Sequence, residues 1–245
     1  MSKKLLLGVC SALVSHTEAE LGIHIVPQIS VDLLVGSRAL IQDMKRSGEL
    51  VILLKPGRKD HQYLIAQGCM SALASREKPF HLRNVISGKE DFVAALTERG
   101  VANAETVARQ LTDGAGSQLR GAPLLALSAQ KIYADYPELR DDQLNYFKLD
   151  CAEGQLALSQ VPPEFEGRLV DAHLAMNGAT ALVADYLFQN TNFYDPYSGT
   201  ATDNLATGLV EDLYGLTAIS YEIDIVKSWI KKLSLEEYFK VVEEQ

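Results

Sequence analysis

The strongest structural signal in this chain lies at residues 50–60, which read LVILLKPGRKD. Five consecutive apolar residues indicate a buried strand over Leu50–Leu54. Pro56-Gly57 predicts a turn, and Asp60 is suited to cap the helix that follows. Apolar residues then recur at helical spacing at Tyr63, Ala66, Met70 and Leu73. The stretch therefore predicts a strand, a turn and a helix in succession.

Further strands are expected on both sides of this unit. The short apolar run Lys4–Cys10 is typical of a buried strand, and its polar and acidic continuation argues against a signal peptide. Leu21–Leu34 has an extended pattern, in which Pro27 should either interrupt the strand or place it at a sheet edge. Phe80–Ile86 completes the expected set of strands in the first hundred residues.

Two more helices are expected in the same region. Ser37 could cap a helix that carries Leu40, Ile41 and Met44 and ends at Gly48. Ser87 and Glu90 match a capping box, which predicts a helix from there to Gly100. Residues 1–100 therefore alternate strand and helix, as an α/β layer does.

Helical patterns dominate after residue 100. Helices are expected over 103–112, 123–136, 139–160 with a break near Gly154, 168–189 and 205–213, with a loop at 113–117. Residues 217–225 alternate apolar and polar residues and could form a strand. A second capping-box match, Ser234 with Glu237, predicts a helical tail. Residues 190–204 are expected to form a long polar loop.

The predicted fold class is α/β or α+β. An N-terminal layer of about three to five strands alternating with helices (residues 1–100) is followed by a mostly helical half (residues 101–245). No Pro/Gly/Ser-rich linker separates the halves, which favours one compact unit over two domains.

The two halves differ in charge. Residues 1–89 carry a balance of +5 and residues 90–245 a balance of −14. The positive excess lies within residues 55–89, at Lys55, Arg58, Lys59, Arg76, Lys78, Arg83 and Lys89. Such a cluster at strand ends and helix N-termini is where an anion would bind. His61 and His81 lie in the same stretch and are the candidates for proton transfer. A solvated basic face that meets an acidic surface is the alternative.

The polar loop holds a second candidate region. Phe193, Tyr194, Asp195 and Tyr197 could form a lid over a site or a contact surface. The chain contains no Walker, Rossmann or nucleophile-elbow motif. No spacing of His, Cys or carboxylate residues predicts a metal site, and no cofactor is indicated.

Composition narrows the function classes further. A pI near 5.1 disfavours a nucleic-acid-binding protein. No apolar run reaches the length of about 20 residues that a membrane span needs. The odd, widely spaced Cys10, Cys69 and Cys151 are expected to be buried free thiols, which favours a cytoplasmic location.

Two functions are compatible with these observations. The first is an enzyme that acts on a small anionic, possibly phosphorylated, substrate held by the cluster at 55–89. The second is a non-catalytic subunit of a homo- or hetero-oligomer, in which the basic half of one subunit contacts the acidic half of a neighbour. Convergence of the basic side chains in a pocket would favour the enzyme, and a flat arrangement would favour the subunit.

Overall fold

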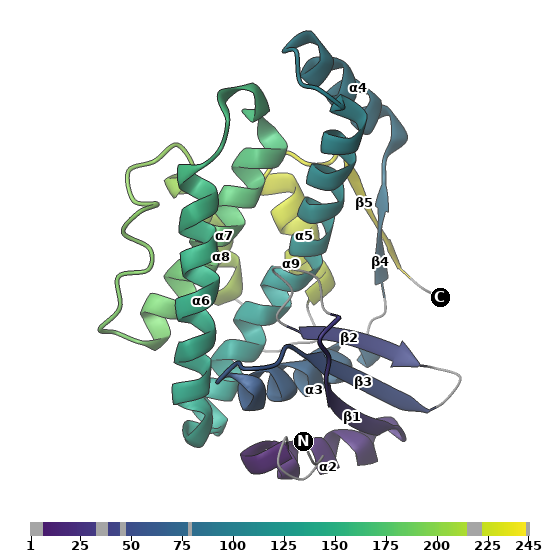
Figure 1. Ribbon diagram of the computed structural model, residues 1–245, viewed down its shortest axis with the longest axis vertical. Helices are drawn as coiled ribbons and strands as arrows, with labels where there is room; N and C mark the ends of the chain where they lie inside the picture. The colour runs from purple at the N-terminus through teal and green to yellow at the C-terminus, as the bar shows by residue number, and fades with distance from the viewer. Residues whose placement is uncertain (1–6, 33–38, 45–47, 78–79, 215–221, 244–245) are drawn as a thin grey trace. The chain divides into compact units, whose positions relative to one another are not determined.

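The computed structural model describes residues 7–32, 39–44, 48–77, 80–214 and 222–243. The chain divides into two compact units, which are described separately below. The N-terminal unit comprises residues 1–77 and 128–146, and the helical unit comprises residues 78–127 and 147–245. The described part is an α+β fold that is mostly helical, with two small sheets (Figure 1).

The N-terminal unit contains a three-stranded sheet and its flanking helices. The strands are β1 (His24–Ile29), β2 (Ala39–Met44) and β3 (Glu49–Leu54), in the order β1-β3-β2. β1 runs parallel to β3, and β2 runs antiparallel to it. Pro27 lies in β1, an edge strand of this sheet, as its missing amide hydrogen predicted.

Two predictions for this unit are wrong. The described part of the expected strand at Lys4–Cys10 is helical: η1 (Gly8–Cys10) leads into α2 (Ser11–Leu21). The expected helix after Ser37 is strand β2, and Ser37 itself lies outside the described residues. β2 pairs along its whole length with β3, from Ala39 opposite Leu54 to Met44 opposite Glu49. Pairing with the next strand in the chain therefore overrides the local helical spacing.

The predicted strand and helix at residues 50–77 are confirmed as β3 and α3 (His61–Glu77). Ile52 and Leu54 of β3 and Tyr63 and Ile65 of α3 are fully buried, which places them in the core of the N-terminal unit. Tyr63 packs against Tyr146 with ring centroids 5.1 Å apart. The segment 128–146, which belongs to this unit although it is distant in sequence, thus supplies part of its core.

Helices account for most of the helical unit. In chain order the elements are β4 (Phe80–Asn84), α4 (Ile86–Glu98), α5 (Ala104–Asp135), η2 (Pro137–Leu139), α6 (Arg140–Ser159), η3 (Pro163–Phe165), α7 (Arg168–Leu187), α8 (Asp203–Tyr214), α9 (Glu222–Lys232) and β5 (Phe239–Glu243). The C-terminal end of α5 and the start of α6 belong to the N-terminal unit. β4 pairs antiparallel with β5, so the N-terminal layer of three to five strands is not confirmed.

α5 is one helix where two helices and a loop were predicted. It runs without interruption through Gly114, Gly116 and Pro123. At Gly116 a β-carbon would lie 3.0 Å from the Phe239 ring, so the glycine permits β5 to pack closely on the helix. Likewise, α6 continues through Gly154, where a break was expected. Gly116 and Gly154 permit close packing and do not end a helix.

The C-terminal predictions are also wrong. Residues 222–225 begin helix α9, whereas a strand was expected over 217–225, of which residues 217–221 lie outside the described residues. The expected helical tail contains strand β5, which pairs with β4 from Phe80 opposite Glu243 to Asn84 opposite Phe239. Ser234 adopts a positive φ of 54°. The chain therefore turns at this residue, and the helix ends before it.

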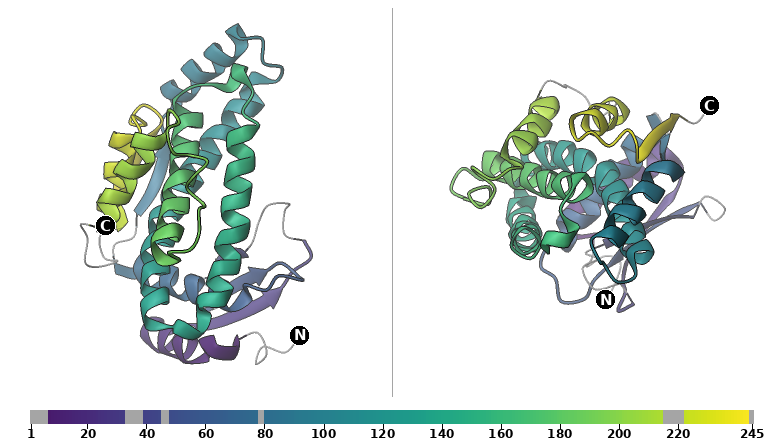
Figure 2. Two further views of the ribbon diagram at one scale, coloured as in Figure 1. Left: turned by 90° about the vertical axis from the view of Figure 1, so that its left-hand side faces the viewer. Right: turned by 90° about the horizontal axis from the view of Figure 1, so that it is seen from above.

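α7 and α8 lie side by side and run in the same direction. A β-carbon on Gly178 of α7 would lie 3.0 Å from the β-carbon of Ala206 of α8. Further along, Tyr186 of α7 contacts Tyr214 of α8. The difference in residue number between the contacting residues is the same in both pairs, so the two helices are parallel. The polar loop at residues 190–204 makes this parallel arrangement possible, because it returns the chain from the end of α7 to the middle of that helix (Figure 2).

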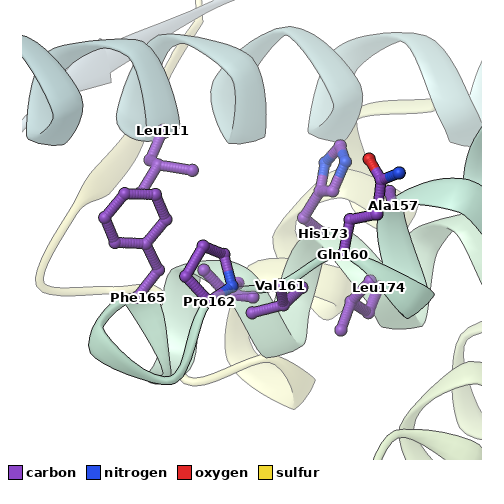
Figure 3. Close-up of a pocket in the computed structure, with 9 residues that line it drawn as sticks. Leu111, Ala157, Gln160, Val161, Pro162, Phe165, His173 and Leu174 are labelled. Atoms are coloured by element: carbon purple, nitrogen blue, oxygen red, sulfur yellow. The ribbon is translucent and has the colours of Figure 1, made fainter.

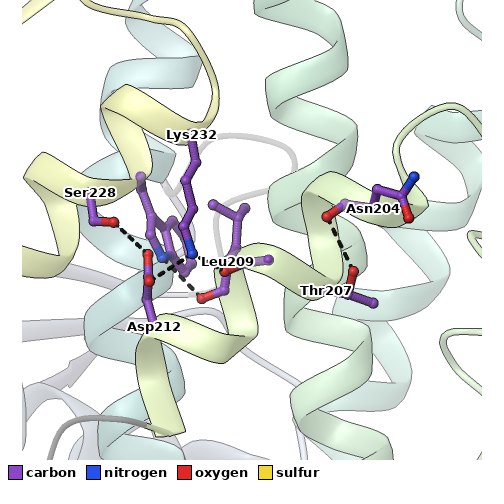
Figure 4. A network of polar contacts seen from close by, with 8 residues as sticks. Asn204, Thr207, Leu209, Asp212, Ser228 and Lys232 are labelled. Carbon is purple, nitrogen blue, oxygen red and sulfur yellow. Dashed lines mark hydrogen bonds and ion pairs between the residues drawn. The ribbon is translucent and has the colours of Figure 1, made fainter.

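A polar network joins α8 to α9. Asp212 accepts hydrogen bonds from Ser228 Oγ at 2.7 Å and from Lys232 Nζ at 2.7 Å (Figure 4). The buried Trp229 donates from Nε1 to the carbonyl of Leu209 at 3.1 Å. These contacts fix the register of the two helices where the core of the helical unit is formed.

Candidate functional site

The basic stretch at residues 55–89 contributes side chains to both units. Lys55, Arg58, Lys59 and His61 lie between β3 and the start of α3, in the N-terminal unit. Arg76 lies near the end of α3, but its side chain and the whole of Lys78 lie outside the described residues. His81, Arg83 and Lys89 belong to the helical unit. The stretch is therefore divided between the two units.

Arg58 is engaged by a carboxylate of its own chain. Its guanidinium forms two bonds to Asp60, from Nε to Oδ1 at 2.7 Å and from Nη2 to Oδ2. Asp60 is fully buried, and the Arg58 side chain is 13% exposed. The bidentate pair satisfies both groups, so Arg58 stabilises the β3–α3 turn and is not free to hold an external anion.

Asp142 is a residue of this cluster that the sequence analysis missed. Its carboxylate accepts a hydrogen bond from the backbone amide of Gln62, at the first turn of α3, at 3.3 Å. Burial raises the pKa of Asp142, and the nearby Asp60 raises it further, against the hydrogen bond from Gln62. No local sequence pattern could have connected Asp142 with this cluster, because Asp142 is 80 residues away from Gln62 in sequence.

His61 is fixed at the same place. Its Nε2 lies 2.7 Å from the carbonyl oxygen of Lys55, so Nε2 carries the proton and Nδ1 is left as the basic nitrogen. The positive charge of His61 would favour ionised Asp142. Lys59 is exposed and Lys55 partly exposed. A carboxylate with a raised pKa beside a histidine can act in acid–base chemistry.

The second cluster lies on the outer face of the β4–β5 sheet. Arg83 on β4 is directly opposite Lys240 on β5, and both side chains are exposed. His81 precedes Arg83 by two residues, so it lies on the same face. Within the described part of the chain neither Arg83 nor Lys240 forms an ion pair. We call His81, Arg83 and Lys240 the basic sheet face.

Lys240 was also missed by the sequence analysis, which expected a helical tail. The sequence Phe239-Lys240-Val241-Val242 has the aromatic and β-branched residues typical of a strand. That signal could have placed Lys240 on an outward-facing strand position.

Lys89 lies in the first turn of α4, which contacts the chain around residue 237 through Gly88. The amide of Val85 donates to the carbonyl of Tyr238 at 2.8 Å. A β-carbon on Gly88 would lie 2.2 Å from the carbonyl oxygen of Glu237. Because the chain around residue 237 packs directly on this turn, Lys89 is not part of an open cradle for an anion.

The loop at 190–204 is held firmly by carboxylates. Asp185 accepts hydrogen bonds from the amides of Phe193 and Tyr194, each at 2.9 Å. The hydroxyl of Tyr194 donates to Asp203 at 2.5 Å. Tyr197 is fully buried, and Asp195 is exposed. The loop residues proposed as a lid or interface therefore divide into buried anchors and an exposed tip.

The helical unit also contains a cavity of about 180 Å³ between α5, α6 and α7 (Figure 3). Most of its lining is apolar, and burial lowers the pKa of His173, one of its two polar residues. Its lining consists of Leu111, Ala157, Gln160, Val161, Pro162, Phe165, Val170, His173 and Leu174. It is smaller than the cavities of about 300 Å³ or more that hold most ligands.

Two further properties concern cofactors and membranes. Among the described residues no three His, Cys, Asp or Glu side chains are placed to hold a metal ion. Across the same residues, no helix has both the length and the apolar character that crossing a membrane requires. The three cysteines are buried and unpaired, as predicted.

Comparison with known proteins adds no further information. No family model, no curated protein and no solved structure matches this chain.

Proposed function

We propose that the protein is a binding subunit that docks an acidic protein surface on its basic sheet face. The observation that carries this proposal is the placement of Arg83 directly opposite Lys240 in the β4–β5 pair. Like charges at opposite positions of an antiparallel pair destabilise a sheet. A carboxylate-bearing partner would remove that repulsion and gain two charge-assisted hydrogen bonds.

The shape of this face favours a protein partner over a small substrate. Its three residues stand on exposed strand positions, and none of them lines the cavity of the helical unit. Small-molecule sites are concave and bury most of their ligand. Protein interfaces are flatter and enriched in arginine. Binding should be rapid and sensitive to salt, because exposed charges steer association.

A direct test uses a fluorescent hexaglutamate peptide as the acidic probe, with binding followed by anisotropy. The double variant Arg83→Ala/Lys240→Ala should weaken binding about tenfold, the effect of about 1.4 kcal/mol. Lys148→Ala/Lys231→Ala is the matched control, because it removes two exposed lysines elsewhere in the helical unit. Equal affinity of both variants for the probe would exclude the proposal.

Catalysis on a small anionic, possibly phosphorylated, substrate is the second candidate. It is favoured by one observation, the raised pKa of Asp142 beside His61 in the N-terminal unit. In this function Lys55 and Lys59 would hold the anion, and His61 with Asp142 would transfer a proton. Pyrophosphate should then raise the melting temperature of the wild type but not of Lys55→Ala/Lys59→Ala. A melting temperature that pyrophosphate leaves unchanged would argue against this site.

A further inference from the structure

We infer that the acidic partner is a second copy of this chain, bound through a face formed by the ends of α7 and α8. This inference rests on the proposed function, because it names the surface that the basic sheet face meets. The residues of this surface are Tyr186 on α7 and Glu211 and Tyr214 on α8, which we call the acidic tyrosine face.

The segment that builds this face carries charge of a single sign. No Lys or Arg occurs between Leu169 and Val226, a segment that includes most of α7, the polar loop and all of α8. The same segment contains eight acidic residues: Asp171, Asp185, Asp195, Asp203, Glu211, Asp212, Glu222 and Asp224. Lys232 of α9 pairs with Asp212, but the segment has no cation of its own to pair with the exposed Glu211. Glu211 can therefore offer negative charge to a basic partner.

The two tyrosines form an exposed pair. Their ring centroids are 5.3 Å apart and their planes are nearly perpendicular, at 89°. Tyr186 remains 55% exposed and Tyr214 53% exposed, although each ring contacts the other. Glu211 is exposed and precedes Tyr214 by three residues, so both lie on one face of α8. The face thus combines aromatic area with a carboxylate.

The polar loop beside the pair is held by hydrogen bonds. Burial and the hydrogen bond to Asp203 raise the pKa of Tyr194, and the nearby Tyr186 raises it further. Tyr194 also stacks on the buried Tyr197, with ring planes 19° apart. Little conformational freedom is therefore lost when a partner binds beside the loop.

The two faces are chemically complementary. The guanidinium of Arg83 can lie over a tyrosine ring, in a cation–π contact, while Lys240 pairs with Glu211. Tyrosine and arginine are the residues that most often dominate the energy of protein interfaces. Because the basic sheet face and the acidic tyrosine face are different surfaces, the contact is head-to-tail and generates a ring or an open chain of subunits.

The first test measures self-association of the full chain by sedimentation velocity. At about 0.1 M salt, charges beyond about 10 Å are screened, so the net charge of −9 should not prevent association. Oligomers should form there and weaken about tenfold near 1 M salt, where screening reaches about 3 Å. Tyr186→Ala/Tyr214→Ala and Arg83→Ala/Lys240→Ala should each be monomeric. Leu149→Ala/Leu156→Ala is the matched control, because it removes similarly exposed apolar residues from α6.

The decisive test mixes the two monomeric variants. One retains only the basic sheet face and the other only the acidic tyrosine face, so a single intact contact should restore a one-to-one complex. No complex in the mixture, or a wild type that is monomeric at every concentration and salt tested, overturns the inference. If hexaglutamate still distinguishes Arg83→Ala/Lys240→Ala from its control, the proposed function stands and the partner is another acidic protein. If the probe also fails, both proposals are wrong.

Discussion

The α-carbon of Gly88 faces the carbonyl oxygen of Glu237, and a β-carbon on residue 88 would lie 2.2 Å from that oxygen. Here the first turn of α4 meets the segment that leads into β5. The obstacle is backbone, which cannot rotate away as a side chain would.

Replacement of Gly88 by alanine should therefore be destabilising, by about 2–3 kcal/mol. Gly114→Ala in α5 is the matched control, because a β-carbon there meets nothing within 4 Å. The control should be neutral or stabilising by up to about 1 kcal/mol, since alanine is the better helix former. Urea unfolding of both variants measures the difference, and equal stabilities would contradict the close packing at residue 88.

The Arg58–Asp60 pair should be strongly coupled. Asp60→Asn keeps a residue suited to cap α3 but removes the charge that Arg58 binds, so it should cost about 3 kcal/mol. A double-mutant cycle with Arg58→Met should give a coupling energy of about 1–3 kcal/mol. Additive effects of the two changes would show that the pair contributes nothing beyond its separate groups.

Tyr197 should act as a structural anchor. It is fully buried, and among the described residues its hydroxyl has no hydrogen-bond partner. Tyr197→Phe should thus be neutral or slightly stabilising, whereas Tyr197→Ala should cost about 3–5 kcal/mol. If residue 197 instead belonged to a lid that opens, the alanine variant would lose little stability in thermal unfolding.

Glu222 should make stability depend on pH. Burial raises its pKa from 4.5 to about 7, and Arg120 only partly opposes this. The folded chain therefore holds this proton more tightly than the unfolded chain. The free energy of unfolding should fall as the pH rises from about 4.5 to about 7 and then level off, a loss of up to about 3 kcal/mol.

Glu222→Gln should flatten this slope and raise the stability at pH 8. Glu236→Gln, at an exposed position, controls for the loss of one negative charge. Urea unfolding at several pH values provides the measurement. A steeper slope in Glu222→Gln than in the wild type would contradict the assignment.

The cysteines should be unreactive while the chain is folded. Cys10 and Cys69 are fully buried, and burial raises the pKa of each thiol to about 12. Since the thiolate is the reactive form, a disulfide reagent such as DTNB should label none of the three cysteines at pH 8 and all three in denaturant. Rapid labelling of the native protein would disprove their burial.

Local sequence predicted the elements whose signals are long and consistent. The run Leu50–Leu54 with its turn and helix, the helix at 168–189 and the helix at 205–213 all have clear periodicity and are confirmed. The wrong predictions include two elements that form by pairing with another strand, which helical spacing does not reveal. β2 exists because it pairs with β3, and β5 because it pairs with β4, more than 150 residues away.

Contacts between side chains also limited the prediction of the candidate site from the sequence. The strand predicted at Phe80–Ile86 placed Arg83 on a strand, as β4 confirms, but the charge count could not reveal that Lys240 lies opposite. It also counted Arg58 as available, although Asp60, two residues later, neutralises it. A count of charges treats every cation alike, whereas burial and pairing decide which remain exposed.

The division of the chain has a consequence for any attempt to dissect it. The segment 128–146, which ends α5 and begins α6, belongs to the N-terminal unit, yet both helices continue into the helical unit. A fragment that ends at residue 77 would lack that segment, and a fragment that starts there would expose its buried Ala129, Ile132 and Tyr146 to water. Truncation at residue 77 should therefore give insoluble fragments, and proteolytic nicking there should leave the two pieces associated.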